Sequence, residues 1–233
     1  MSTEIRNMFK GPLEDSNYLE KTLIPSLGLN NENLSEQPEE LSDYFGTGYG
    51  LKIWQYPNQF SKYLSLISDY AFKIESYIEV GCRHGGTFVT HCEYLEALNP
   101  KFKSAIAVDL IQIPEMLSNY VTFNKKTTFM QGDSTSEPFK VWAQGEFFDL
   151  AFIDGDHSYE GVKSDGELMR DLCNIQVYHD ITSDPCPGVG QYWKELKAEC
   201  SDIYDFYEFT EQYDSVNGTY LGIGVAVRKN WIK

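Results

Sequence analysis

Two hydrophobic patterns alternate along most of the chain. Short apolar runs rich in β-branched residues are typical of buried strands, and longer stretches with apolar residues every three or four positions are typical of helices. The predicted strands are Ser76–Val80, Ser104–Leu110, Thr127–Gln131, Phe148–Ile153, Asn174–Tyr178, Ile203–Thr210 and Leu221–Arg228. The predicted helices are Asn58–Lys73, Thr87–Leu98, Glu115–Asn124, Pro138–Gln144, Tyr159–Leu172 and Val189–Cys200. This order predicts an α/β, Rossmann-like, doubly wound sheet of seven strands, mostly parallel, with an antiparallel C-terminal hairpin.

The first 50 residues break this alternation. They are polar and acidic, contain few β-branched residues, and favour only short helices near Asn17–Ile24 and Pro38–Tyr44. One interpretation, which we favour, is a solvated and partly mobile extension; the other is a lid or oligomer arm over a binding site. We therefore predict an N-terminal extension over residues 1–50 and one α/β domain over residues 51–233.

Net charge and cysteine content indicate which binding partners and which cellular location to expect. A formal net charge of −16 repels phosphate backbones and acidic lipid surfaces, so we expect no nucleic-acid partner and no membrane partner. The N-terminus lacks the apolar segment of a signal peptide, and no apolar run approaches the roughly 20 residues that span a bilayer. Five cysteines without a C-x-x-C pair indicate reduced thiols in a cytoplasmic protein. The acidic N-terminal arm is compatible with a homo-oligomer.

The most informative stretch is the loop after the first predicted strand. It reads Glu79-x-Gly81-x-x-x-Gly85-Gly86-Thr87, and the glycines let the backbone approach a ligand that faces the free N–H groups of the following helix. A dinucleotide loop would instead read G-x-G-x-x-G. The acidic residue and the spacing resemble the first motif of class I S-adenosylmethionine (AdoMet) methyltransferases. This resemblance implies that the five residues bind the methionine end of AdoMet.

Three further residues lie in or near this loop. Arg83 and His84 are candidates for contacting the methionine carboxylate of AdoMet, with a role on the protein surface as the alternative. His91 falls in the following helix and is predicted to be structural. Cys82 is expected to serve as a small side chain that fits the loop, because no base stands at a spacing that would activate it as a nucleophile.

Acidic residues follow successive predicted strands. Ligands of open α/β sheets bind at the carboxyl ends of the strands, where Asp109, Asp133, Asp154 and Asp180 all lie. Asp109 is placed to accept hydrogen bonds from both ribose hydroxyls of a nucleoside. Similarity to class I methyltransferases implies adenine contacts for Asp133 and its neighbour Ser134. A turn aspartate beside a helix-capping serine is the alternative for this pair.

The fourth and fifth predicted strands end in a more specific pattern. Residues 152–165 read FIDGDHSYEGVKSD and residues 178–180 read YHD. Over residues 54–229 the chain closely resembles the small-molecule O-methyltransferase group that includes cephalosporin-hydroxylase-like and macrolide-sugar methyltransferases. The resemblance implies a divalent metal, usually magnesium, held by Asp154, His179 and Asp180, with Asp154 also close to the cofactor and to the reaction. Histidine stands where other members have an acid, which shifts the metal preference toward manganese, iron or zinc.

His157 is the candidate catalytic base. A sugar hydroxyl is too weak an acid to attack unaided at neutral pH, whereas a divalent cation lowers its pKa and an imidazole then takes the proton. His157 directly follows the acidic pair of the fourth strand, and its alternative roles are capping the next helix or orienting Asp154. Asp156 is expected to orient His157 or to complete the metal shell.

The acceptor pocket is the least constrained part of the prediction. Tyr49, Tyr56, Tyr159 and Trp193 are the aromatic candidates for its lining. The proline-rich loop over residues 184–188 directly follows the proposed metal site, so it is expected to form a rim of the same pocket.

The combined hypothesis is an AdoMet-dependent O-methyltransferase. It would transfer a methyl group to the hydroxyl of a small molecule, with a sugar, nucleotide-sugar or natural-product glycoside as the expected acceptor. One alternative is an NAD-dependent oxidoreductase on a similar sheet, which the glycine spacing disfavours. Another is a non-catalytic AdoMet-binding subunit, which the acids at four strand ends disfavour.

Overall fold

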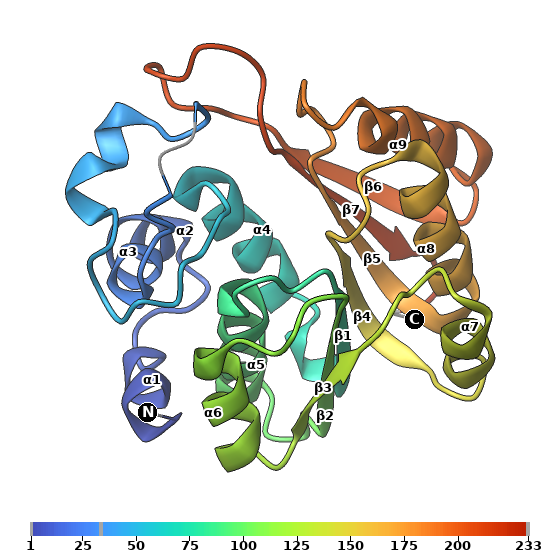
Figure 1. Cartoon of the computed structure of the whole chain (residues 1–233), viewed down its shortest axis with the longest axis horizontal. Helices are drawn as coiled ribbons and strands as arrows, with labels where there is room; N and C mark the ends of the chain where they lie inside the picture. Colours follow the sequence, from blue (N-terminus) through green and yellow to red (C-terminus); the bar gives the residue numbers. More distant parts are fainter. Residues whose placement is uncertain (1, 33–34, 232–233) are drawn as a thin grey trace.

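A seven-stranded sheet forms the centre of the molecule (Figure 1). The computed structural model describes residues 2–32 and 35–231. The strands are β1 (Ser76–Val80), β2 (Ser104–Asp109), β3 (Thr127–Gln131), β4 (Phe148–Ile153), β5 (Cys173–His179), β6 (Tyr204–Phe209) and β7 (Ile223–Arg228). Their order is β3-β2-β1-β4-β5-β7-β6; β1 to β5 run parallel, and β7 pairs antiparallel with β5 and β6. The predicted fold class is confirmed.

A helix follows each of the five parallel strands. These helices are α5 (Gly86–Leu98), α6 (Glu115–Phe123), α7 (Glu137–Ala143), α8 (Tyr159–Leu172) and α9 (Pro187–Glu199), and α4 (Pro57–Ser68) precedes β1. Helix α4 ends five residues earlier than predicted, because the chain tightens into a short 3-10 turn, η3 (Ala71–Lys73), before it enters β1. In Figure 1, α4, α5 and α6 lie on one face of the sheet, and α7, α8 and α9 lie on the other.

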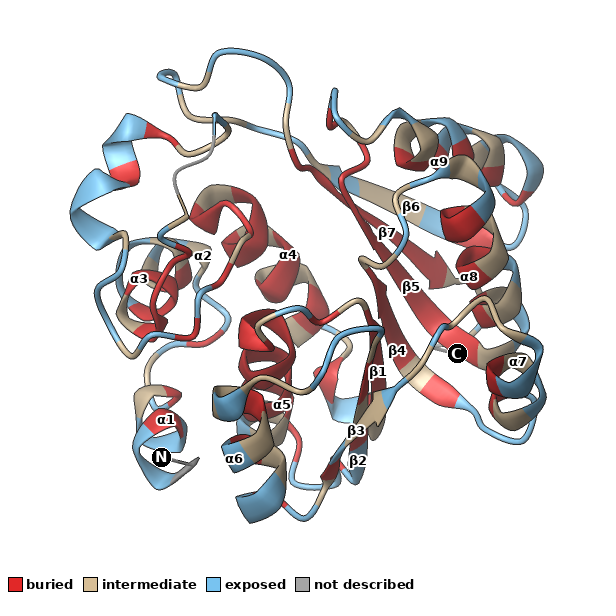
Figure 2. Ribbon diagram, in the orientation of Figure 1, coloured by how far each residue is buried: buried red, intermediate tan, exposed pale blue. Residues whose placement is uncertain are grey.

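Two hydrophobic cores, one on each face, bury the strands from both sides. Along β4, Leu150 and Phe152 pack into the core under α4 and α5, whereas Ala151 and Ile153 pack into the core under α8 and α9. Figure 2 shows the resulting continuous buried stretches along the central strands. Such double burial is typical of parallel sheets, and it explains why these strands read as unbroken apolar runs.

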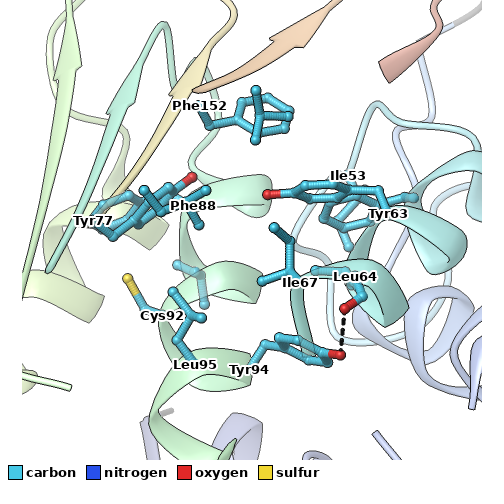
Figure 3. Packing of buried hydrophobic residues seen from close by; sticks show 14 of the residues in the cluster. Ile53, Tyr63, Leu64, Ile67, Tyr77, Phe88, Cys92, Tyr94, Leu95 and Phe152 are labelled. Carbon is cyan, nitrogen blue, oxygen red and sulfur yellow. Dashed lines mark hydrogen bonds between the residues drawn. The ribbon is translucent and has the colours of Figure 1, made fainter. Parts of the chain in front are cut away.

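Helix α4 packs against α5 with the apolar stripe that the sequence predicts. Tyr63 and Ile67 are fully buried beside Leu95 of α5 (Figure 3). The hydroxyl of Tyr94 in α5 donates a hydrogen bond of 2.7 Å to the backbone carbonyl of Leu64 in α4, so the two helices are joined by a polar contact inside an apolar interface. This pair of helices supports the strand ends that carry the site.

The first 50 residues contribute to the core, and the expectation of a solvated extension is wrong. The segment contains α1 (Ser2–Met8), α2 (Ser16–Tyr18), the π-helical turn η1 (Leu19–Leu23), α3 (Ile24–Leu27) and the 3-10 turn η2 (Glu39–Tyr44). Leu19, Leu23 and Leu27 repeat every four residues and are buried in the same core as α4 and α5. The backbone of Leu29 also pairs with Phe45 and Ile53. The polar and acidic composition of the first 50 residues as a whole hid this short stripe.

Among the described residues, no helix has both the length and the apolar character needed to cross a membrane. The five cysteines are all free thiols.

Candidate active site

One cavity of about 940 Å³ opens at the carboxyl ends of the parallel strands. The sheet hydrogen bonding continues past the strand ends and draws them together: the N–H of Gly81 donates to the carbonyl of Val108, and the N–H of Asp154 donates to the carbonyl of Val80, both at 2.8 Å. Most of the residues singled out in the sequence line the cavity: Glu79, Gly81, Cys82, Arg83, His84, Gly86, Thr87, Asp109, Asp133, Ser134, Asp154, Asp156, His157, His179 and Asp180. Gly85 does not; its Cβ position faces Leu117 of α6.

The glycine loop is shaped by the chain itself. Gly81 has a φ of +82°, and a Cβ there would clash with the backbone of Asp154. A Cβ on Gly86 would clash with the carbonyl of Leu51. These two glycines are therefore required because β1, β4 and the segment before α4 approach one another closely. The sequence suggested glycine only for the approach of a ligand, so this packing role is additional.

Residues of the N-terminal segment contact the outside of this loop. The Glu32 carboxylate pairs with the Arg83 guanidinium and with Nε2 of His84, both at 3.0 Å. The Arg83 guanidinium also lies 4.0 Å from the ring centre of Trp54, which makes a cation–π contact. These contacts engage Arg83 and His84 with the N-terminal segment, and both residues also line the cavity, so both of the roles weighed for them stay open.

Glu79 belongs to a closed polar network beneath the cavity. It is 1% exposed and accepts a hydrogen bond from the Tyr77 hydroxyl. Burial raises the pKa of Glu79 well above its ordinary value. Nδ1 of His91 donates to the carbonyl of Thr87 at 2.9 Å, and the Tyr63 hydroxyl donates to Nε2 at 2.8 Å. Burial lowers the pKa of His91 to about 3, so the ring is neutral and structural, as predicted.

The acids after β2 and β3 have different surroundings. Asp109 accepts the backbone N–H of Arg83 at 2.7 Å and that of Ile111 at 3.1 Å, so it fixes the glycine loop as well as its own turn. Asp133 is exposed and accepts both the N–H and the hydroxyl of Thr135, which is the turn geometry weighed as its alternative role. These bonds lower the pKa of Asp133. Both carboxylates keep oxygen lone pairs for a ligand in the cavity.

The acids after β4 and β5 meet around one histidine. Nδ1 of His179 lies 3.1 Å from Oδ1 of Asp154 and 3.6 Å from Oδ2 of Asp180. Asp180 has a φ of +64°, a left-handed turn that short polar residues tolerate, and this turn brings its carboxylate back toward the cavity. Burial disfavours an imidazolium at His179, but Asp154 and Asp180 outweigh it and raise the pKa of His179 to about 10.

His157 lies at the mouth of the same cluster. Its side chain is 37% exposed, and its Nε2 lies 3.3 Å from Oδ1 of Asp154. The hydrogen bonds with Asp154 and Cys186 raise the pKa of His157 to about 11 when only protein groups surround it. Asp156 does not contact the His157 ring in this arrangement; its carboxylate accepts the N–H of Ser158 at 2.8 Å and closes the turn into α8.

Two further predicted residues, from the glycine loop, are engaged with the chain. The Thr87 hydroxyl donates to the side-chain oxygen of Gln55 at 2.7 Å, which ties the start of α5 to the segment before α4. Cys82 is buried, and burial raises the pKa of its thiol, so the structure agrees with its role as a small packing residue.

The predicted aromatic lining is wrong, and other residues contribute to the wall. Tyr49, Tyr56, Tyr159 and Trp193 do not line the cavity; Trp193, for example, is 2% exposed inside the core under α9. Trp54, Tyr220 and Cys186 do line it. Cys186 belongs to the 184–188 loop, whose position as a rim is correct. Trp54 and Tyr220 lie outside the strand–helix pattern, and no motif marks them.

Comparison with known proteins agrees with this arrangement. The family described as "Methyltransferase domain" matches residues 78–181, from β1 to the turn after β5. Comparison with curated proteins finds no match.

Solved structures of similar fold are distant in sequence. MycE, a methyltransferase from the mycinamycin biosynthetic pathway solved with Mg and S-adenosylhomocysteine, has 13% identity and a TM-score of 0.51, covering 74% of this chain and 51% of that chain. A Klebsiella pneumoniae protein proposed to be an O-methyltransferase has 14% identity and a TM-score of 0.53, covering 94% and 90%. A proposed RNA methyltransferase from Pyrococcus horikoshii has 12% identity and a TM-score of 0.53, covering 94% and 98%. These likenesses establish the fold alone.

The family match coincides with the glycine loop and with the acids after β2, β4 and β5, and it settles the choice against the dinucleotide alternative. Residues 78–181 match a methyltransferase domain, which assigns this part of the chain to an enzyme of the methyltransferase class.

Proposed function

We propose that the chain is an O-methyltransferase that transfers the methyl group of AdoMet to a hydroxyl of a small molecule, with a divalent cation and a histidine base. The observation that carries this proposal is that acids from four strand ends line a single cavity together with His157 and His179. A sugar, nucleotide-sugar or natural-product glycoside is the proposed acceptor. The fold likeness to MycE, a methyltransferase of mycinamycin biosynthesis, and to the Klebsiella protein supports methyl transfer to oxygen only by analogy.

AdoMet would occupy the half of the cavity between β1 and β3. Asp109 is proposed to accept the ribose hydroxyls, and Asp133 and Ser134 to bind the adenine edge. Glu79, Gly81, Gly86 and Thr87 would surround the methionine end, with Gly85 shaping the loop. The net negative lining favours a sulfonium cation over its neutral product, because opposite charges attract most strongly where water is partly excluded.

Asp154, His179 and Asp180 form a donor set that fits a divalent cation. Their ligand atoms lie within 4.8 Å of one another. Oδ1 of Asp180 is buried without a hydrogen-bond partner, which is a cost that a cation beside the carboxylate would offset. Two oxygens and one nitrogen suit magnesium or manganese. When bound, such a cation lowers the pKa of an acceptor hydroxyl.

His157 is proposed to take the proton of the acceptor hydroxyl. It is the more exposed of the two histidines, and it faces the cavity mouth through which an acceptor enters. Asp154 holds the ring by its Nε2 side, so the imidazole has a fixed orientation. A cation among the same carboxylates would oppose their effect on the His157 pKa and so favour the neutral ring that a base needs.

Two measurements test this proposal. Isothermal titration calorimetry of the full chain is expected to detect binding of AdoMet and of S-adenosylhomocysteine, and Asp109→Ala is expected to weaken both by about tenfold or more, as loss of a charged hydrogen-bond partner predicts. Glu115→Ala, an exposed acid at the start of α6, is the control that leaves affinity unchanged. Equal affinities for Asp109→Ala and the unsubstituted chain would remove Asp109 from the donor site.

The acceptor is tested with AdoMet carrying a labelled methyl group and a panel of nucleotide-sugars and glycosides. The expected product is an acceptor heavier by one CH2 whose new methyl group is bonded to oxygen, as shown by nuclear magnetic resonance. Methyl transfer to nitrogen or carbon only would contradict the proposal while leaving the family assignment intact.

A further inference from the structure

Cys186 has no part in the proposed reaction, yet it lies among chemically active groups. It stands at the N-terminus of α9, with its Sγ 3.2 Å from Nδ1 of His157 and 3.5 Å from Oδ2 of Asp180. Nδ1 of His157 is itself 3.6 Å from Oδ2 of Asp180. Sulfur, nitrogen and oxygen therefore form a nearly equilateral triangle at the cavity wall.

This triangle has the dimensions of one face of a tetrahedral metal site. Zinc ligands at about 2.0–2.3 Å in tetrahedral geometry are separated from one another by about 3.3–3.6 Å. The three observed separations, 3.2, 3.5 and 3.6 Å, fall on or next to that range. We infer that Cys186, His157 and Asp180 form a second cation position, the outer position, which takes a thiophilic divalent ion of the zinc class.

The surroundings of the outer position favour a ligand. The Asp180 side chain is 7% exposed, and its Oδ1 is buried without a hydrogen-bond partner. His157 is 37% exposed, so the fourth corner of the tetrahedron opens toward the cavity, where a water molecule completes the coordination.

The outer position differs in chemistry from the one formed by Asp154, His179 and Asp180, which we call the inner position. The two share Oδ2 of Asp180. The inner position offers mainly oxygen and suits magnesium or manganese, whereas a thiolate and an imidazole select zinc or cobalt. Coordination at the outer position releases two protons to solvent, the thiol proton of Cys186 and the Nδ1 proton of the His157 imidazolium. It also occupies Nδ1 of His157, so an ion there would block His157 as a base.

Cobalt absorption spectroscopy of the full chain tests the inference directly. Titration with Co²⁺ is expected to produce a thiolate-to-cobalt charge-transfer band with one equivalent bound. Cys186→Ser is expected to lose this band and to bind Zn²⁺ more than about tenfold more weakly. Cys200→Ser, at the opposite end of α9, is the matched control that keeps both. Absence of the band in the unsubstituted chain, or its persistence in Cys186→Ser, would overturn the inference.

Two further titrations separate the positions and do not depend on methyl transfer. Zn²⁺ is expected to displace the cobalt band and Mg²⁺ is not, because magnesium binds thiolates poorly. Asp154→Asn removes a carboxylate ligand of the inner position but keeps all three outer ligands and an amide oxygen that can still accept from Nε2 of His157, so it is expected to keep the band. Loss of the band in Asp154→Asn, or its displacement by Mg²⁺ at the concentrations that saturate the inner position, would refute a separate thiophilic position. Calorimetry with S-adenosylhomocysteine establishes in each variant that the domain is folded.

Discussion

Two buried groups of acids and histidines lie one on each side of the end of β4, and they shift the pKa of their histidines in opposite directions. In the network beneath the cavity, Glu79 and His91 are fully buried and linked through the Tyr77 hydroxyl. In the cluster at the cavity wall, Asp154 and Asp180 surround His179 directly. The pKa of His91 is lowered to about 3, whereas that of His179 is raised to about 10.

Burial alone does not explain this contrast, because His91 and His179 are both almost completely buried. The difference lies in the partners. His91 is bonded to a carbonyl and a tyrosine hydroxyl, which stabilise a neutral ring, and the one nearby acid, Glu79, has its own pKa raised. His179 faces two carboxylates whose negative charge outweighs the cost of burial. Neutral partners therefore make a structural histidine, and paired acids make a charged cluster suited to a cation.

The largest effect is expected from breaking the cluster. Asp180→Asn removes the carboxylate shared by the inner and outer positions, so Mn²⁺ affinity measured by calorimetry is expected to fall by more than about 100-fold, beyond what loss of a supporting residue costs. Methyl transfer should be lost while S-adenosylhomocysteine still binds. Asp184→Asn, an exposed acid four residues further on, is the control. Unchanged Mn²⁺ affinity in Asp180→Asn would end the metal hypothesis.

Breaking the network beneath the cavity is expected to cost stability instead of activity. His91→Leu leaves the Tyr63 hydroxyl and the Thr87 carbonyl without their buried partner, so the free energy of unfolding in urea is expected to fall by about 1–3 kcal/mol. His84→Leu, on the same loop–helix segment but at the surface, should change it by less than about 0.5 kcal/mol. Similar losses in both variants would contradict the structural role given to His91.

The residues of the cavity wall were predictable from the sequence to different degrees. Carboxyl ends of parallel strands meet at one edge, so Asp109, Asp154 and Asp180 could be placed together from sequence. Cys186 could not, because its approach to His157 depends on the left-handed turn at Asp180 and on how the following loop folds back.

The segments outside the strand–helix pattern were the least predictable. Trp54 reaches the cavity only because the segment before α4 packs on the glycine loop, against the Gly86 backbone. Leu19, Leu23 and Leu27 form an apolar stripe, but the acidic composition around them favoured a solvated extension. Local pattern predicts elements, whereas contacts between distant segments depend on packing that periodicity does not encode.

Histidine titration is expected to sharpen the contrast in a single experiment. The chain has four histidines, and nuclear magnetic resonance should show a His91 ring that stays neutral down to about pH 5. His179 and His157 should stay charged up to about pH 9 and lose their protons near 10 and 11. A divalent cation should move the signals of these two and leave His91 unaffected. A His91 ring that titrates near pH 6.5 would contradict its assignment to the closed network.

The same pKa values predict how the cluster affects stability. The unfolded chain releases its imidazole protons near pH 6.5, whereas the folded chain holds those of His179 and His157 to about 10 and 11. Their contribution is therefore complete below pH 6.5 and is lost as the pH rises toward 10, by at most about 1.4 kcal/mol per pH unit for each ring. Urea unfolding at pH 7 and pH 9 measures this loss, and equal stability at both would contradict the raised pKa values.

The smallest effect is expected where a histidine and an acid meet at the surface. Glu32 bridges Arg83 and His84, but the three side chains are 37%, 58% and 29% exposed, so water and salt screen their attraction. Glu32→Gln keeps the size of the side chain and should lower the free energy of unfolding by less than about 1 kcal/mol, with the difference vanishing in high salt. A larger loss that persists in high salt would mean that this bridge, like the buried cluster, holds the N-terminal segment on the glycine loop. Acidic partners would then hold a histidine in place at the surface as well as in the buried cluster.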